Sequence, residues 1–361
     1  MGDLPLPHRV AAMTTLLAGD IGGTKTLLSL HDAAGLATLS SRRYPSADWQ
    51  DLAAMVLDFL AHTDLQGLAR PTAACLAVAG PVHGGRAQLT NLSWNLHERD
   101  LADACAISRL ELVNDFAVLI YGLPHLQAAQ LATVRPGEAE AESPLLILGA
   151  GTGLGVALGV HTCTGLQAQA SEASHGDFAP RSQQEWDLKQ WIQCDRRLER
   201  VSIERVVSGT GLGDVARWLL ASRDPGGLHP LSEQAARWLA GEPKPGGCDA
   251  DAGQRADLPA AVAEAASSGD PLALEALELW LGAYGSVCGD LALTSLSRGG
   301  IWLAGGTAAK LLQELRSPRF TEAFLAKGRL RAALEPMPIQ AVIDPDFGGY
   351  SAACRARMLL T

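Results

Sequence analysis

The chain has 361 residues, of which 47% are hydrophobic and 19% charged, and its formal net charge at pH 7 is −10. This length accommodates about two domains of ~150 residues, and the acidic balance argues against nucleic acid as a partner. Seven scattered cysteines without a C-x-x-C pair favour reduced thiols in the cytoplasm over a disulfide framework or a zinc-thiolate site.

The N-terminal apolar stretch, residues 10–18, superficially resembles a signal peptide. Cleavage after it would remove the strand that the next motif needs, so residues 1–14 are interpreted as a short extension. The longest uncharged apolar stretch, residues 145–160, contains five glycines and is short for a membrane helix. We therefore predict no transmembrane segment and no membrane partner.

The first motif, residues 20–25, is a glycine turn between two stretches predicted to be strands. A carboxylate at a strand end, here Asp20, can hold Mg²⁺ or its waters. Gly22 and Gly23 lack Cβ atoms, so their backbone N–H groups can approach phosphate oxygens. The P-loop spacing G-x-x-x-x-G-K-[ST] is absent. A nucleotide phosphate grip and an ordinary hairpin with a Gly-Gly turn both remain open at this point.

The first third of the chain alternates predicted strands and helices. Strands joined by glycine turns favour antiparallel hairpins, and strands separated by helices favour parallel crossovers. A mixed sheet covered by helices satisfies both. The predicted strands are residues 16–19, 26–30, 73–78 and 110–113, and the predicted helices are residues 49–62 and 96–106.

Asn114 and Asp115 follow one of these strands, where α/β folds commonly keep catalytic groups. A carboxylate there can accept a hydroxyl proton as the oxygen attacks a phosphoryl group, while the amide hydrogen-bonds the substrate. The alternative is a strand-to-helix cap, because Asx residues favour helix N-caps.

A second glycine motif begins after an acidic, proline-flanked linker at residues 136–144. Residues 145–157 repeat the opening pattern of apolar strand, glycine-threonine turn and apolar strand, which predicts two related halves. The spacing does not meet G-x-G-x-x-G, because Val156 follows Gly155, and a strand rather than a helix comes next. The dinucleotide-binding fingerprint is therefore rejected.

Glu172 and His175 are three residues apart and suit a polar ligand. Carboxylate-bridged metal helices need two E-x-x-H copies and this chain has one, so recognition of a polyol is the functional interpretation. A surface pair is the alternative. Glu204 is either another hydroxyl acceptor or a solvated helix residue.

The remainder is predicted to be mainly helical. A predicted strand, residues 301–304, ends at Gly305 and Gly306 before a helix, which indicates either a ligand-binding helix start or a tight turn. Residues 241–258 are predicted to be an exposed loop. The predicted helices are residues 183–200, 212–221, 271–295 and 308–315.

Taken together, these segments resemble one family, the bacterial-type glucokinases of the hexokinase group. Each motif alone is weak, but eight in the family's order and spacing are specific. The resemblance extends from about residue 16 to the C-terminus. It rests on residues 19–24, 79–82, 90–94, 113–116, 149–155, 175–180, 204–209 and 303–306.

The resemblance implies an α/β fold of the two-domain, actin-like ATPase (ribonuclease H-like) type, with mixed sheets flanked by helices and a cleft between the domains. The small domain would comprise residues 1–125 and 343–361, and the large domain residues 126–342. The implied reaction is ATP-dependent phosphorylation of glucose at its 6-hydroxyl, with domain closure on sugar binding to exclude water. We also expect a cytoplasmic homodimer.

The resemblance also assigns site residues. Asp115 matches the catalytic base, and Asp20 matches a possible Mg²⁺ ligand through water. The sugar-binding positions, which include the base, are Asn91, Asn114, Asp115, Glu172, His175 and Glu204. The ATP-binding positions are Gly19, Asp20, Ile21, Gly22, Gly23 and Thr24 in the first phosphate loop, Gly151, Thr152 and Gly153 in the second, and Gly305 and Gly306 beside adenosine.

One segment departs from the family pattern. The family has G-E-G-G-H where this chain has Ser171-Glu172-Ala173-Ser174-His175. If these positions need positive φ, Ala173 and Ser174 would be strained, which bears on sugar selectivity more than on reaction type. A kinase for mannose, glucosamine or an N-acetylhexosamine, a non-catalytic sugar sensor, and polyphosphate as donor are the alternatives.

Overall fold

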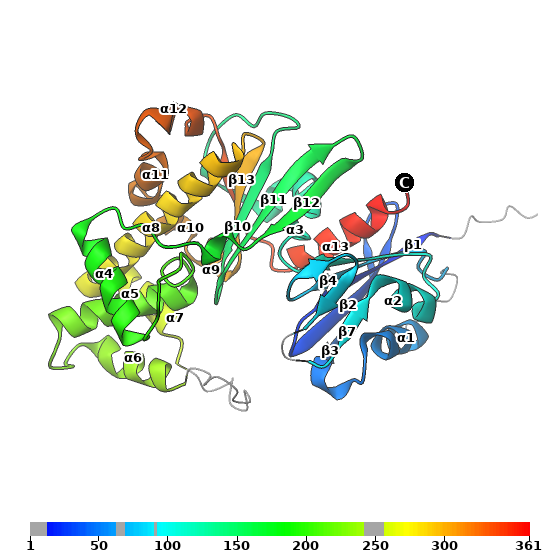
Figure 1. The fold of residues 1–361 in the computed structure, drawn as a ribbon, viewed down its shortest axis with the longest axis horizontal. Coiled ribbons are helices and arrows are strands. Elements are labelled where there is room, and N and C mark those ends of the chain that lie inside the picture. Colours follow the sequence, from blue (N-terminus) through cyan, green and yellow to red (C-terminus); the bar gives the residue numbers. More distant parts are fainter. Residues whose placement is uncertain (1–12, 63–68, 90–91, 242–255) are drawn as a thin grey trace, which may run out of the picture. The chain divides into compact units, whose positions relative to one another are not determined.

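The computed structural model describes residues 13–62, 69–89, 92–241 and 256–361 (Figure 1). The chain divides into two compact units: unit 1 is Met1–Leu126 with Asp344–Thr361, and unit 2 is Gln127–Ile343. These boundaries lie one residue beyond those expected from the sequence. Asn91, residues 1–12 of the expected extension and residues 242–255 of the expected loop lie outside the described residues.

Unit 1 is built on a mixed sheet in the order β3-β2-β1-β4-β8. β1, β2 and β3 pair antiparallel because short turns join them, whereas β1, β4 and β8 pair parallel across longer connections that contain helices. The four strands predicted here are confirmed, with slightly different ends. The bounds are β1 (Thr15–Ile21), β2 (Lys25–Asp32), β3 (Thr38–Pro45), β4 (Ala73–Val78) and β8 (Arg109–Asn114).

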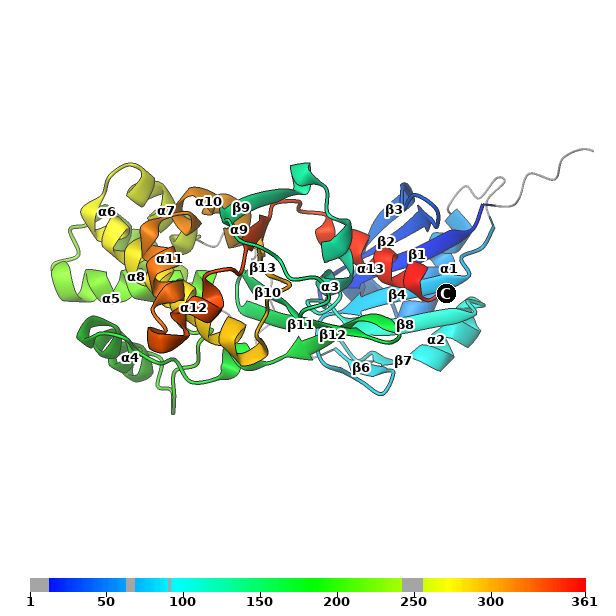
Figure 2. The same cartoon turned by 90° about the horizontal axis from the view of Figure 1, so that it is seen from above.

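Helices cover both faces of this sheet (Figures 1 and 2). α1 and α2 join a core with buried residues such as Leu17 and Ile21 of β1, and α13 packs against β1 and β4. The helix predicted at residues 96–106 begins later, because residues 95–97 form a strand, and the one predicted at 49–62 begins at Leu52. The bounds are α1 (Leu52–His62), α2 (Glu98–Cys105), α3 (Leu119–Gly122) and α13 (Phe347–Met358), with 3-10 turns η1 (Ser46–Asp48) and η2 (Leu123–His125).

A separate three-stranded antiparallel sheet, in the order β5-β6-β7, lies between β4 and α2 in the chain of unit 1. Gly84 and Gly85, both with positive φ, make the tight turn between its first two strands. Ala87 and Leu96 point into the core of unit 1, so the opposite face carries the polar residues. The bounds are β5 (Val82–His83), β6 (Arg86–Gln88) and β7 (Asn95–His97).

Unit 2 repeats the arrangement of unit 1. Its sheet has the order β12-β11-β10-β13-β14-β9, in which the first three strands are antiparallel and β10, β13 and β14 are parallel. Only β9, antiparallel on the edge, has no counterpart. The prediction of two related halves is confirmed. The bounds are β9 (Leu131–Arg135), β10 (Leu145–Ala150), β11 (Leu154–Thr162), β12 (Gly165–Ser171), β13 (Gly300–Ala304) and β14 (Ile339–Val342).

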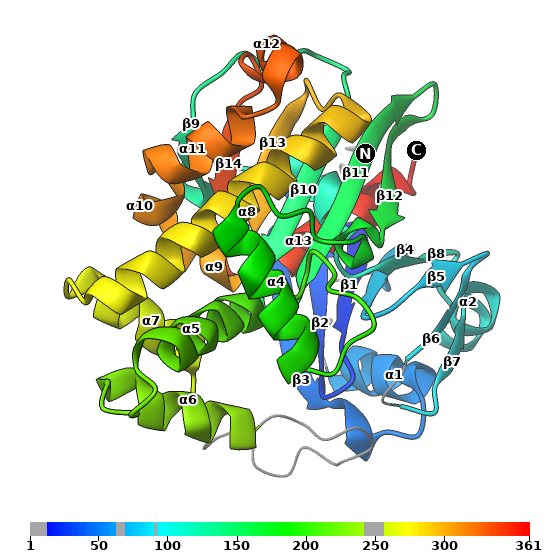
Figure 3. The same ribbon diagram turned by 60° about the vertical axis from the view of Figure 1, so that its left-hand side comes forward.

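The helices of unit 2 bury a large apolar core, and the long α8 crosses one face of the sheet (Figure 3). The predicted helix 271–295 is confirmed, but the one predicted at 308–315 is interrupted at Leu311 and the one at 183–200 ends at Asp195. The bounds are α4 (Gln183–Asp195), α5 (Gly209–Arg223), α6 (Pro230–Ala240), α7 (Leu258–Ser267), α8 (Pro271–Ser295), α9 (Gly306–Lys310), α10 (Leu312–Leu315), α11 (Pro318–Leu325) and α12 (Arg331–Leu334), with 3-10 turns η3 (Ala128–Gln130), η4 (Ala173–His175) and η5 (Gly328–Leu330).

Two further properties concern the described residues alone. No helix among them is both long and apolar enough to span a membrane. Six of the seven cysteines lie in the described part of the chain, and all six are free thiols, four of them buried.

Candidate active site

The first glycine turn is a hairpin between β1 and β2, held from the end of β3. The Gly22 N–H donates to the carbonyl of Lys25 at 3.0 Å, and a Cβ on Gly22 would lie 2.8 Å from that same oxygen. Ser46 Oγ donates to the carbonyl of Gly22 at 2.7 Å. The segment is thus a hairpin turn, a geometry that both interpretations share, and the close approach explains why Gly22 cannot carry a side chain.

Asp20 and Asp115 lie on the same edge of the unit 1 sheet. Asp20 is the last residue but one of β1, and Asp115 follows β8, with its N–H donating to the carbonyl of Val78 in β4 at 2.9 Å. Burial, and after it the nearby charge of Asp20, together raise the pKa of Asp115 to about 6. Burial also raises the pKa of Asp20, and Arg43 opposes that shift. A carboxylate that titrates near neutrality can act as a general base.

Arg43 reaches Asp20 through the sheet register. Asp20 pairs with Leu27, and Leu27 pairs with Arg43, so the three residues form one row across β1, β2 and β3. Because directly paired residues point to the same face, the guanidinium lies on the side of the Asp20 carboxylate. Arg43 could not be predicted from the sequence, because only the pairing of β1, β2 and β3 brings it near the glycine turn of residues 20–25.

Asn114 fixes the neighbouring carboxylate. Its Oδ1 accepts from the N–H groups of Phe116 and Ala117 at 3.1 and 2.9 Å, so the capping interpretation is confirmed. Its Nδ2 donates to the carbonyl of Gly80 at 3.0 Å and to Asp115 Oδ1 at 3.1 Å. The same side chain therefore caps the turn after β8 and orients Asp115.

The second glycine turn, between β10 and β11, rests on the start of α5. The Gly209 N–H donates to the carbonyl of Gly151 at 2.7 Å, and Thr210 Oγ1 donates to that of Thr152 at 2.8 Å. Ser208 caps the helix by accepting the Gly211 N–H at 2.9 Å. Backbone N–H groups at a glycine turn and a helix N-terminus together suit an anionic phosphate.

A cavity of about 570 Å³ opens beside this turn. Gly306 and Thr307, which follow β13, line this cavity. Gly305 before them has a φ of +82°, and a Cβ there would lie 2.8 Å from the carbonyl oxygen of Ala150, so both features require glycine. Thr307 Oγ1 donates to that same carbonyl at 2.7 Å. The structure thus brings the predicted second loop and the Gly305-Gly306 turn together. The cavity is lined by Gly151, Thr152, Gly209, Thr210, Leu212, Trp238, Ala256, Asp257, Pro259, Ala260, Ala263, Gly306, Thr307, Lys310 and Leu311.

Sequence analysis missed several of these lining residues, notably Thr210, Trp238 and Lys310. The string Ser208-Gly209-Thr210 is a signal that could have been used, because an N-cap serine before a glycine-threonine pair marks a helix start. Nothing local distinguishes Trp238 from other tryptophans of the chain.

Buried charges hold Trp238 in the cavity wall. The Arg196 guanidinium lies 5.6 Å from the centre of the Trp238 ring, and Arg196 Nη2 lies 2.5 Å from Asp214 Oδ1. Asp214 is fully buried, and Arg217 Nη1 also contacts it at 3.1 Å. Burial raises the pKa of Asp214, against which both guanidinium groups act. A buried carboxylate needs such paired charges, so this cluster is rigidly specified.

Glu172 and His175 flank a short 3-10 turn, with His175 Nε2 3.6 Å from Glu172 Oε2. The His175 and Glu172 side chains are 54% and 77% exposed, as a surface pair would be. Neither Ala173 nor Ser174 has a positive φ, because both lie in the right-handed turn. The strain considered for these positions is therefore absent.

Glu204 lies beside this pair and against the second glycine turn. Its N–H donates to the carbonyl of Ser174 at 2.9 Å, and its Oε2 accepts the Leu154 N–H at 2.9 Å. A Cβ on Gly153 would lie 2.4 Å from that oxygen, so glycine makes room for the carboxylate. The interpretation of Glu204 as a solvated helix residue is wrong, because it lies in a turn between α4 and α5 and is hydrogen-bonded.

Comparison with known proteins extends over almost the whole chain. The family model described as Glucokinase matches residues 17–358. A glucokinase from Trichormus variabilis is 38% identical over 351 residues, covering 96% of this chain and 100% of that protein. A glucokinase from Synechocystis is 39% identical over 354 residues, covering 94% and 98%.

A solved glucokinase from an Antarctic psychrotroph superposes with a TM-score of 0.73 at 28% identity, covering 95% of this chain and 98% of that one. Together with the repeated sheet order, this similarity establishes the two-unit actin-like ATPase fold. The chain belongs to the glucokinase family.

Proposed function

We propose that this chain transfers the terminal phosphoryl group of ATP to the 6-hydroxyl of glucose, giving glucose 6-phosphate and ADP, with Asp115 as the general base. Membership of the glucokinase family supports the reaction. The observation that carries the role of Asp115 is its position at a strand end, oriented by Asn114 and beside a second carboxylate.

Asp115 accepts the proton of the sugar hydroxyl as its oxygen attacks phosphorus. Burial and the charge of Asp20 together raise the pKa of this carboxylate to about 6, so at pH 7 and above it is largely ionised and yet more basic than an ordinary aspartate. Asn114 donates to Asp115 Oδ1 and so leaves the other carboxylate oxygen for the substrate. Such positioning of a base contributes about 10²- to 10⁴-fold in rate.

The nucleotide binds in the cavity of unit 2. Gly151, Thr152 and Gly153 with the first residues of α5 bind phosphates, and Gly305 and Gly306 lie beside adenosine. Trp238 offers a flat aromatic surface for the base, and Lys310 a positive charge. The first loop, from Gly19 to Thr24, grips phosphate from unit 1.

Asp20 provides one carboxylate that could hold a magnesium ion. Mg²⁺ in kinases keeps several waters and takes one or two carboxylates together with substrate phosphates. Among the described residues no three acidic, histidine or cysteine side chains gather to hold a metal, so Asp20 would act as a single carboxylate, through water. When bound, the ion supplies charge neutralisation for the phosphates.

Glucose hydroxyls are bound by Asn114, Glu172, His175 and Glu204, and Asn91 contributes from outside the described residues. Glu204 already accepts the Leu154 N–H with Oε2, which leaves Oε1 for a hydroxyl. The Glu172–His175 pair offers an acceptor and a group that can donate or accept. The regular backbone of Ala173 and Ser174 favours ordinary glucose specificity over an altered sugar. Domain closure on sugar binding stays a prediction.

A coupled assay for ADP release tests this function. We expect turnover that requires ATP, Mg²⁺ and glucose, with kcat/KM for glucose above that for mannose, glucosamine and N-acetylglucosamine. If kcat/KM is higher for one of those sugars, that sugar and not glucose is the substrate. If polyphosphate supports turnover without ATP, polyphosphate is the phosphoryl donor. Calorimetric binding of glucose without any ADP release would instead establish a non-catalytic sensor.

A cytoplasmic location and a homodimer also belong to this proposal, the first supported by the free thiols of the described chain. Sedimentation equilibrium decides the second. We expect a mass twice that of the chain at micromolar concentration, and a single-chain mass would refute the dimer.

A further inference from the structure

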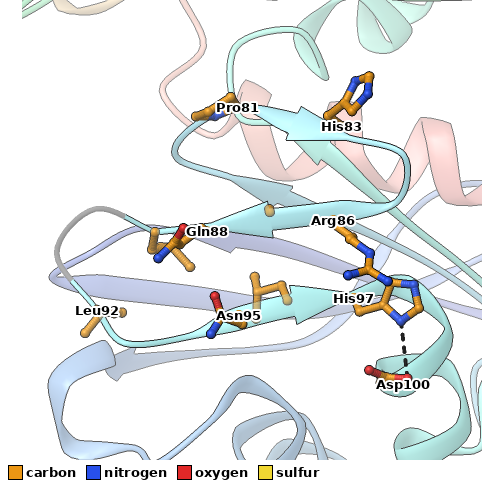
Figure 4. A pocket seen from close by; sticks show the side chains of 11 residues that line it. Pro81, His83, Arg86, Gln88, Leu92, Asn95, His97 and Asp100 are labelled. Atoms are coloured by element: carbon orange, nitrogen blue, oxygen red, sulfur yellow. Dashed lines mark ion pairs between the residues drawn. The ribbon is translucent and has the colours of Figure 1, made fainter.

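A second cavity, of about 910 Å³, lies on the polar face of the three-stranded sheet of unit 1 (Figure 4). Side chains alternate between the faces of a strand, and directly paired residues share a face. The register pairs His83 with Arg86 and Arg86 with His97. These three basic side chains therefore form one row across β5, β6 and β7.

Arg86 carries the permanent positive charge of this row, and two carboxylates lie close by: Asp100 lines the cavity, and Glu98 lies against Gly85. His97 Nδ1 lies 3.2 Å from Asp100 Oδ1, whereas the side chains of His83 and Arg86 make no hydrogen bond or ion pair to any described residue. Figure 4 shows Arg86 reaching toward His97. The guanidinium of Arg86 and the imidazole N–H groups of the same row are hydrogen-bond donors that suit an external anion.

A second row on the same face carries amides. Gln88 pairs with Asn95, two residues along from Arg86 and His97, and both amides are exposed. Side-chain amides donate and accept at once, as sugar hydroxyls require. At ~3.4 Å per residue the rows lie about 7 Å apart, comparable with the length of a hexose that carries a terminal phosphate.

We propose that this face binds a hexose phosphate, with the phosphate on the row of His83, Arg86 and His97 and the sugar hydroxyls on Gln88 and Asn95. The proposal rests on the proposed function, because the product of that reaction, glucose 6-phosphate, belongs to this ligand class. The lining residues Pro81 and Leu92 offer apolar surface to the sugar ring at the amide end. This face would thus be a second binding site for hexose phosphates, separate from the residues assigned to catalysis.

Isothermal titration of the full chain with glucose 6-phosphate tests the proposal, with glucose and ADP present at saturation to occupy the catalytic residues. We expect binding to persist, and Arg86→Gln to weaken it about 10- to 100-fold, the usual effect of a hydrogen bond to a charged group. Arg99→Gln is the matched control, because it removes an exposed guanidinium of α2 that does not line the cavity, and its binding should equal that of the wild type.

A second pair of ligands separates the two rows. Gln88→Ala should weaken glucose 6-phosphate about 2- to 10-fold and leave inorganic phosphate unchanged, because the amide contacts the sugar alone. Inorganic phosphate that binds wild type as tightly as glucose 6-phosphate would overturn the role of the amide row.

Two results would overturn the site as a whole: no binding once glucose and ADP are saturating, or equal binding by Arg86→Gln and Arg99→Gln. Circular dichroism verifies that each variant is folded, and His83→Gln provides a second test of the basic row. The measurement needs no turnover. If the chain binds neither glucose nor ADP, the proposed function fails, while the comparison of Arg86→Gln with Arg99→Gln still decides this proposal.

Discussion

Units 1 and 2 share one strand order but differ in the residues that follow their parallel strands. In unit 1, carboxylates stand at the ends of β1 and β8: Asp20 is the last residue but one of β1, and Asp115 directly follows β8. In unit 2, the corresponding β10 and β14 end in small or apolar residues, and glycine turns with threonine hydroxyls line a cavity. In the proposed function, the same backbone arrangement places the general base and the magnesium ligand in unit 1 and the binding of phosphate and nucleobase in unit 2.

Topology therefore determines the positions at which a functional group can lie, and the residue types at those positions determine the chemistry. A hairpin followed by parallel crossovers brings three strand ends to one edge of each sheet. The residue types at those ends then divide the work between the units. Substitutions that act on one unit alone can test this division.

The largest effect is expected in unit 1 from Asp115→Asn. Because the amide cannot accept the hydroxyl proton, kcat should fall about 10²- to 10⁴-fold while the protein stays folded. Coupled ADP release measures it. Asp103→Asn, an exposed aspartate of α2, is the matched control and should turn over normally. Normal turnover by Asp115→Asn would refute the assignment of Asp115 as the general base.

In unit 2, Trp238→Ala should raise KM for ATP by about 5- to 150-fold, the usual cost of losing an aromatic ring that stacks on a base. KM for glucose should change little, because Trp238 lines the proposed nucleotide cavity and is not one of the proposed sugar-binding residues. Trp238→Phe should recover part of the affinity. Trp186→Ala, which removes a 46% exposed ring of α4, is the control. An equal rise in both KM values would contradict the division.

The pH profile sharpens the same comparison. Asp115 must be ionised to act as a base, and its pKa is raised to about 6, first by burial and then by the charge of Asp20. Thus kcat/KM should fall about tenfold per pH unit below pH 6. Asp20→Ala removes the neighbouring charge, so whatever activity remains should show its acid limb at lower pH. An unchanged limb would refute the coupling between the two carboxylates.

Stability should respond in the opposite direction to activity. A carboxylate whose folded pKa lies above its unfolded value favours folding at pH below both values, and that contribution is lost as pH rises through about 6. Asp115→Asn avoids this loss, so it should melt at a higher temperature than wild type at pH 8, with the difference shrinking toward pH 4. Calorimetry at both pH values checks it, and a lower melting temperature at pH 8 would argue against desolvation of Asp115.

The smallest effect is expected from Ala173→Gly combined with Ser174→Gly, which restores the family's glycines. Neither residue has a positive φ, so glycine relieves no strain and adds only flexibility. We expect the preference for glucose over mannose to change less than about threefold. A large shift in preference would show that the backbone of this turn sets sugar selectivity.

Much of the fold was predictable because its signals are local. Apolar runs bounded by glycine turns predicted β1, β2, β10 and β11, and the repeat of that pattern predicted two related halves. Longer helices were predicted within a few residues, whereas the break at Leu311 and the strand before α2 were not. Short elements carry too few residues for periodicity to distinguish a strand from a helix.

The candidate site was only partly predictable. Glycine positions and strand-end carboxylates are visible in the sequence, since a turn restricts its own residues. Arg43 and Trp238 were missed, because strand register brings one to Asp20 and packing on Arg196 and Asp214 brings the other to the cavity. Neither relation leaves a local pattern.

By itself, the sequence determined the family, the two glycine turns and the carboxylates of unit 1, because backbone freedom and hydrophobic periodicity are properties of neighbouring residues. Only the tertiary structure decided that Glu204 meets Gly153, that Asn114 both caps a turn and holds Asp115, and that the loop at Ala173 and Ser174 is unstrained. These depend on contacts between residues distant in the chain or on the backbone angles that packing selects.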